Sequence, residues 1–528
     1  MQGCIFEQDG DNMRMTNKII QNNSLYNINQ NKVLQDKLST QMSTQKKLTR
    51  PSDDPVVAIR ALRLRSSVSE LEQYEEKNAP DAESWLKVTA DGLGTVTDIL
   101  TDLSKNANKG ANKDLTADDL DIIITQMRSL SEEFYSTGNL DYAGRYVFTG
   151  YRTDTPMQFT AADVANTIDP IPSYQITEQL SIADFDSINY TNIGNLAGTT
   201  VTNATDASHY LVEQDVKNAD IHRLQLAYEK LDDSKGVTLT FGAANRAKGT
   251  GTAVSIPTTM TSAEDAYKAI ADGTEEAVFI STTGELVFSD TFFKTNIETI
   301  GEDQEIRVTY DKASNSWENG DLRPEHYFAC ETTGADPIVY NQKYFTEGKE
   351  KQVISYDVGY NQTIEINTTA DEVFNHSLTR NIDDLENALN ELKNIEEIRD
   401  ALDTAKAMET EGTPAYENLV KQREAAEKAH TYIREKLHDL LQTSITWMQG
   451  YLDSANVAVT DNGTRSSRLS LIQKRLTEQK TTFKTLQSDN EDADIAEVAV
   501  QLTSAELTYN ASLTATGKIM NTTLMNFI

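Results

Sequence analysis

The chain has 528 residues, of which 38% are hydrophobic and 7% aromatic, and its net charge is −34. This length predicts two or three domains. The low aromatic content favours long helices that each bury one stripe over a large enzyme core. The negative charge excludes nucleic acid as a general partner.

The charge is unevenly distributed along the chain. Met13 to Arg65 holds ten Lys or Arg and three Asp or Glu, and Gly463 to Ile528 is neutral, with seven of each. Ser66 to Asn462 carries −38. We therefore expect the two ends to pack against copies of themselves and the acidic middle to face water. A basic arm for nucleic acid is disfavoured, because the basic residues alternate with an apolar stripe and no aromatic residues interleave with them.

Three features bear on redox chemistry, membranes and export. Two cysteines, Cys4 and Cys330, are too few for a disulfide framework. No apolar run approaches the length of a membrane span, so no membrane insertion is expected. Residues 1–12 lack the basic start and apolar core of a cleaved signal peptide. We interpret them as a leader, with a non-native origin as one alternative, because Met13 and Met15 are better first residues.

The first part of the chain has helical periodicity. Ile19, Tyr26 and Val33 lie seven residues apart, as expected of one helix face. A seam with alternating steps of three and four follows at Leu86, Thr89, Leu93, Val96, Leu100 and Leu103. A third helix is predicted by Leu120, Ile123, Met127, Leu130 and Phe134.

The sequence Pro51-Ser52-Asp53-Asp54-Pro55 separates the first two helical stripes. We expect Pro51 to end the first helix, Asp54 to cap the second, and Pro55 to take its first position. Two adjacent carboxylates could also indicate metal or acid–base chemistry. With no His nearby, a helix-start loop is the better interpretation.

Between Gly150 and about Thr369 the period changes from helical to two, which predicts an antiparallel β domain. Thr283-Gly284 is expected to turn a hairpin between two short apolar runs. One short helix is predicted at Ala263–Ala271.

Helical periodicity returns from Asp371, with Leu385, Ala388, Leu392, Ile395 and Leu402 on one face. Breaks are predicted at Glu411-Gly412-Thr413-Pro414 and at Asp461-Asn462-Gly463. The last helix is expected after the acidic turn Asp489 to Asp494, which suits the positive end of a helix dipole.

Four motifs at the two ends of the chain resemble the hook-associated protein 3 branch of the flagellin family. They are the start Met13-Arg14-Met15-Thr16-Asn17-Lys18, the run from Ser39 to the Ser52-Asp53-Asp54-Pro55 loop, the block Tyr146-Val147-Phe148-Thr149-Gly150-Tyr151-Arg152-Thr153-Asp154-Thr155-Pro156, and Glu491-Asp492-Ala493-Asp494-Ile495-Ala496-Glu497. Each motif is weak by itself, but four in order are specific. The resemblance covers Met13–Phe159 and Asp371–Ile528.

The resemblance implies an α+β fold. Long N- and C-terminal helices pair into a flagellin-like coiled-coil bundle, and a central antiparallel β domain is inserted between them. An inner helical domain is expected from residues 13–60 and 489–528, and a middle helical domain from 61–149 and 371–488 with extra helices. Residues 150–370 are the expected outer, variable β domain.

By the same resemblance the chain is expected to be a structural component of the bacterial flagellum at the junction of hook and filament. It is exported through the flagellar apparatus with an export chaperone. It contacts copies of itself in a ring or helical turn, a neighbouring hook-associated protein, and flagellin. Its assembly interface is expected at Leu502, Tyr509, Leu513, Met520, Leu524 and Phe527, opposite Ile19 and Tyr26.

Three alternatives stay open. Filament flagellin is the near one, although its usual final residues differ. An enzyme is disfavoured, since the six His include no His-Glu-x-x-His and no nucleophile elbow or phosphate-binding loop is present. His430 and His438 lie two turns apart, too far to share an ion. We therefore expect no catalytic residue, metal or cofactor. A surface adhesin that uses the outer β domain is the third alternative.

Overall fold

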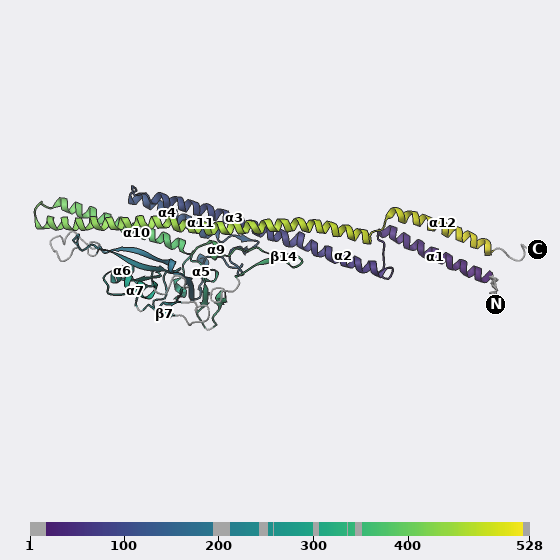
Figure 1. The fold of residues 1–528 in the computed structure, drawn as a ribbon, viewed down its shortest axis with the longest axis horizontal. Coiled ribbons are helices and arrows are strands. Elements are labelled where there is room, and N and C mark those ends of the chain that lie inside the picture. Colours follow the sequence, from purple (N-terminus) through teal and green to yellow (C-terminus); the bar gives the residue numbers. More distant parts are fainter. Residues whose placement is uncertain are drawn as a thin grey trace, which may run out of the picture. The chain divides into compact units, whose positions relative to one another are not determined.

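The computed structural model describes residues 17–193, 212–241, 252–256, 258–298, 306–334, 336–343 and 351–520. The chain divides into two compact units (Figure 1). Unit 1 comprises residues 1–80, 357–362 and 470–528, and unit 2 comprises 81–356 and 363–469. The predicted α+β organisation, with helical ends and a central β region, is confirmed.

Unit 1 is built from helices of both chain ends. They are α1 (Asn17–Thr44), α2 (Pro55–Gln73), a π-helical turn (Tyr74–Asn78), the end of α11 (Pro414–Glu491) and α12 (Ile495–Met520). Asp54 caps α2 as predicted, with its side chain accepting from the N–H groups of Val56 and Val57. The prediction that Pro51 ends the first helix is wrong, because α1 ends at Thr44 and Gln45 takes a positive φ of 58°.

Unit 2 contains a helical layer of α3 (Ala79–Gly110), α4 (Ala117–Thr137), α10 (Ser377–Met408) and the first part of α11. The seam predicted on α3 is confirmed, since all six of its residues from Leu86 to Leu103 are fully buried. The face predicted for α10, from Leu385 to Leu402, is buried as well. Gly412 takes a positive φ of 86° in the turn between α10 and α11, where a break was expected.

The turn predicted at Asp461-Asn462-Gly463 is wrong, because α11 runs through it without interruption. Asn462 is buried, and its Nδ2 donates to the Leu86 carbonyl of α3 at 3.0 Å. Because the Asn462 amide bonds to α3, it does not compete for the backbone hydrogen bonds of its own helix. The exposed Gly463 costs the helix only about 1 kcal/mol relative to Ala.

The β region of unit 2 has a five-stranded sheet in the order β4-β5-β10-β9-β8. Its strands are Phe185–Thr191, Asn218–Gln225, Glu285–Phe288, Ala277–Ile280 and Thr258–Met260 in that order. The hairpin at Thr283-Gly284 and the helix α6 (Ala263–Ala271) are confirmed. One pair, β8 with β9, is parallel and departs from the predicted antiparallel pattern, because α6 makes the crossover between these strands.

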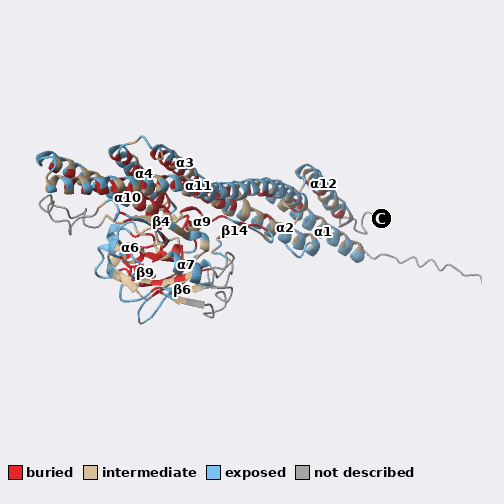
Figure 2. Ribbon diagram, turned by 60° about the vertical axis from the view of Figure 1, so that its left-hand side comes forward, coloured by how far each residue is buried: buried red, intermediate tan, exposed pale blue. Residues whose placement is uncertain are grey.

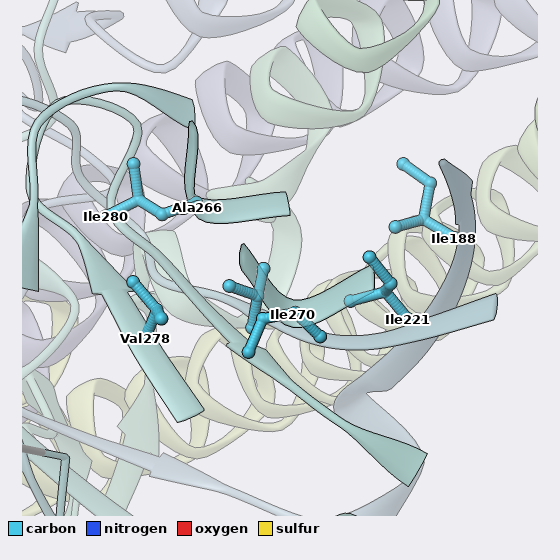
Figure 3. Close-up of a cluster of buried hydrophobic side chains, with 7 residues drawn as sticks. Ile188, Ile221, Ala266, Ile270, Val278 and Ile280 are labelled. Atoms are coloured by element: carbon cyan, nitrogen blue, oxygen red, sulfur yellow. The ribbon is translucent and has the colours of Figure 1, made fainter. Parts of the chain in front are cut away.

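Apolar side chains fix α6 on one face of this sheet. The cluster comprises Ile188, Ile221, Ala266, Ile270, Val278, Ile280 and Val287 (Figure 3). Burial of these side chains explains the position of α6, whose polar residues face water.

A six-stranded sheet has the order β13-β12-β3-β11-β6-β7. Its strands are Val339–Tyr340, Ala329–Thr332, Tyr174–Leu180, Ile306–Lys312, Thr238–Phe241 and Thr252–Ser255 in that order. The structure also has two hairpins, β1–β2 (Asp141–Tyr142, Arg145–Tyr146) and β14–β15 (Ser355–Gly359, Gln362–Glu365). The remaining described elements are the short helices α5 (Ala161–Val164), α7 (Asp290–Asn296) and α9 (Ala370–Val373) and the 3₁₀ turns Ile182–Asp184, Ser314–Ser316 and Pro324–His326.

Buried ion pairs join the five-stranded sheet to α10 within unit 2. Arg223 of β5 donates to Glu285 at 2.9 Å and to both carboxylate oxygens of Asp384 at 2.9 and 2.7 Å. Arg380 bonds Glu229 and the Thr283 carbonyl. Buried residues concentrate in the β region and where it meets α10, whereas α1 and α12 are largely exposed (Figure 2).

Candidate assembly interface

Helices α1 and α12 of unit 1 pack antiparallel, side by side in Figure 1. Near one end Lys46 Nζ lies 2.5 Å from Asp492 Oδ1, and further along Asn31 Nδ2 lies 3.4 Å from Ser512 Oγ. The apolar core between the helices is small, with Leu38, Val498 and Ala505 buried and Ala493 and Leu502 packed against them.

The residues between the two helices form a polar seam. On α1 the buried and half-buried positions recur at Ser24, Ile28, Asn31, Gln35 and Leu38. On α12 they recur at Val498, Leu502, Ala505, Tyr509, Ser512 and Thr516. The alternating steps of three and four are those of a coiled coil, but five of these eleven positions are Ser, Thr, Asn or Gln.

Further apolar side chains of both helices lie on the opposite faces, where no described residue of the chain covers them. Ile19, Tyr26 and Val33 are 47%, 64% and 65% exposed. On α12, Val500 and Leu507 are 71% and 72% exposed and again lie seven residues apart. A seven-residue step keeps these side chains on one face, about half a turn from the seam.

An exposed apolar triplet, Val56, Ile59 and Leu62, extends this pattern to α2. Nearby, a cavity of about 190 Å³ opens between the loop after α1, the first turns of α2 and the end of α11. Its walls include Leu48 and Pro51. Unit 1 therefore presents apolar side chains from three helices to its surroundings.

Ion pairs tie the loop side of unit 1 together. Arg65 binds Glu491 through two bonds of 2.7 and 2.5 Å, a bidentate geometry. The hydrogen bond from Arg65 lowers the pKa of Glu491. Lys480 pairs with Glu75 and Glu76 at 2.6 and 2.5 Å. Glu491 belongs to the acidic turn before α12, so this turn supplies an ion pair as well as a helix cap. The cap is Asp494, whose side chain accepts from the N–H groups of Ala496 and Glu497.

The structure separates the predicted interface residues into three groups. Leu502 and Tyr509 are half-buried in the seam with α1, so they serve pairing inside the chain. Leu513, Ile19 and Tyr26 are exposed. The side chain of Met520, and Leu524 and Phe527, lie outside the described residues. Val500 and Leu507 were missed, although their seven-residue spacing is visible in the sequence.

The described part of the chain offers no group of three His, Cys, Asp or Glu side chains able to hold a metal. His430 Nε2 lies 3.2 Å from Glu396, and His438 Nε2 lies 3.0 Å from the Ala111 carbonyl, so both have separate structural partners. Among the described helices, none is long and apolar enough to cross a membrane.

Comparisons with known proteins agree with the N-terminal motifs. Residues 15–153 match the bacterial flagellin N-terminal helical region. Flagellar hook-associated protein 3 of Salmonella typhimurium is 27% identical over 143 residues, which is 27% of this chain and 45% of that protein. The protein of the same name from Escherichia coli is 27% identical over 144 residues, with the same shares. The matched part of the chain thus spans less than half the length of these relatives.

Among solved structures, a putative flagellar hook-associated protein from Vibrio parahaemolyticus is 13% identical, covers 83% of this chain and 100% of its own, and has a TM-score of 0.36. FlgL from Xanthomonas campestris is 11% identical, covers 80% and 99%, and has a TM-score of 0.29. The resemblance to the flagellin family is confirmed for the N-terminal helical part of the chain.

Proposed function

We propose that this chain is a structural component of the bacterial flagellum that forms the junction between hook and filament. The observation that carries the proposal is the match of residues 15–153 to the flagellin N-terminal helical region, together with curated relatives that bear the name hook-associated protein 3. Filament flagellin is the less supported alternative. In this role the chain has no catalytic activity, leaves the cell through the flagellar export apparatus with a chaperone, and contacts a neighbouring hook-associated protein and flagellin.

The proposed assembly uses the two opposite faces of helices α1 and α12 in unit 1. The polar seam between α1 and α12 is used within the chain, and the apolar faces of both helices remain for copies of the same chain. Head-to-tail stacking buries Ile19, Tyr26 and Val33 of α1 and Val500 and Leu507 of α12. Leu513, Met520, Leu524 and Phe527 remain proposed members of the same interface.

Tyr26→Asp tests this interface. Tyr26 is 64% exposed in the single chain, so the change should leave its thermal unfolding unchanged. In the assembly it would bury an uncompensated carboxylate at every subunit contact, at a cost of several kcal/mol, roughly. We expect an exported protein, bare hooks and flagellin shed into the medium.

Asn27→Asp on the same helix is the matched control, because Asn27 is exposed and lies away from the apolar face. It should support normal filaments. Filaments attached normally by the Tyr26→Asp variant would show that this face of α1 meets water. Immunogold labelling of intact flagella would separately distinguish a junction from a filament location.

A further inference from the structure

A cavity of about 480 Å³ opens in unit 2. Its walls come from the edge strand β4, the first two turns of α6, and the face of α10 that turns toward the sheet. The cluster in Figure 3 holds β4 and α6 together, with Ile188 contributed by β4 and Ala266 and Ile270 by α6. The volume lies in the range of small-molecule pockets.

The floor of this groove is buried, and its charged side chains pair with one another. Arg223, with its side chain 2% exposed, is held between Glu285 and Asp384. Thr283 Oγ1 donates to Glu285 at 2.8 Å. Because these groups are paired with one another, the floor shapes the groove and leaves recognition to the rim.

The rim of the groove carries amide side chains that are available to bind a ligand, beside an aromatic ring. Asn387, Asn390 and Asn394 are exposed and follow one another by three and four residues on one face of α10. None of the three makes a hydrogen bond to another described residue. Across the groove, Tyr190 of β4 stacks on Tyr267 of α6, with ring centroids 5.9 Å apart and planes 15° apart.

This combination matches the chemistry of a neutral saccharide. Each Asn amide offers two donors and an acceptor, which suits pairs of adjacent sugar hydroxyls. A tyrosine ring presents an apolar face that can cover sugar C–H groups. Six carboxylates line the groove against three basic side chains, which disfavours phosphorylated or other anionic ligands. We propose that this groove binds a neutral saccharide, either free or as part of a surface glycan.

The test uses the full chain with cellobiose, maltose, lactose and N,N′-diacetylchitobiose as neutral probes and 3′-sialyllactose as the anionic probe. We expect saturable binding of at least one neutral disaccharide by saturation-transfer NMR. The double variant Asn387→Ala, Asn390→Ala should weaken it by about tenfold or more, since two amide side chains that hydrogen-bond the sugar are lost.

Alanine at exposed helix positions preserves folding. Asn456→Ala, an exposed position of α11 outside the groove, is the matched control and should bind like the unchanged chain. Binding to both an immobilised neutral glycan and the free disaccharide would identify the ligand as a surface glycan. Binding to the free disaccharide alone would identify it as a soluble saccharide. No neutral binding, binding of the sialylated probe only, or equal binding by the double variant would overturn the proposal.

Discussion

Desolvation in the folded chain lowers the pKa of two histidines of unit 2, the buried His326 and the half-buried His376. Burial lowers the pKa of His326 to about 3, with a further lowering by Arg323 and Arg152, and burial lowers the pKa of His376 to about 4. The unfolded chain takes up these protons near pH 6.5, whereas the folded chain does not, so stability is lost as the pH falls from about 6.5 toward 4. Each histidine contributes about 1.4 kcal/mol per pH unit in this window.

His326→Gln and His376→Gln should each remove about one proton from the slope of unfolding free energy against pH between 6 and 4.5. Chemical unfolding at several pH values, followed by the fluorescence of the buried Trp317, measures this slope. The fully buried Glu178 has the opposite effect on the free energy of unfolding, because burial raises its pKa to about 7. Its contribution to stability is lost as the pH rises from about 4.5 through 7. A slope that both variants leave unchanged would contradict the assignment.

At the scale of an element, the start of α2 depends on one carboxylate. Asp54 Oδ1 accepts from the Val56 and Val57 N–H groups at 3.0 and 3.1 Å, whereas the neighbouring Asp53 side chain makes no such bond. Asp54→Ala should therefore destabilise the first turn of α2 by about 1 kcal/mol, and Asp53→Ala should have no comparable effect. Hydrogen exchange of the Ala58 and Ile59 amides reports the difference. Equal protection in the two variants would mean that packing, not the cap, holds this turn.

At the scale of the whole molecule, the two units have unequal cores. Among the described residues, the apolar cluster buried between α1 and α12 consists of Leu38, Val498 and Ala505, while unit 2 buries the α3 seam and the facing side chains of both sheets. Since local opening is easiest where few apolar contacts hold an element, limited proteolysis of the isolated chain should first remove α1 and α12. Mass spectrometry should then find a resistant fragment that retains α3 to the middle of α11. Early cleavage inside the six-stranded sheet, with α1 and α12 intact, would contradict this order.

Local chemistry in the sequence determined much of this fold. The Asp54 cap, the bounds of α6, the turn at Thr283-Gly284 and the buried seam of α3 were all predictable, because capping, turn geometry and periodicity depend on residues close in the chain. The N-terminal motifs likewise indicated the resemblance to the flagellin N-terminal helical region, which residues 15–153 match. The polar groove beside α10 was not predictable, because β4, α6 and α10 are brought together only by tertiary contacts.

Local sequence patterns did not predict the features of the fold that depend on long-range contacts. Asn462 favours a turn in isolation, but its bond to α3 keeps α11 continuous. The stripe of Ile19, Tyr26 and Val33 was recognisable as a helix face, yet α12 packs on the opposite face, which carries Ser24, Asn31 and Leu38. Periodicity shows that a helix has an apolar face, but only the position of distant segments shows what covers that face. The sequence by itself therefore determined most of the helices and their apolar faces, and the tertiary structure decided which face is covered within the chain and which stays exposed.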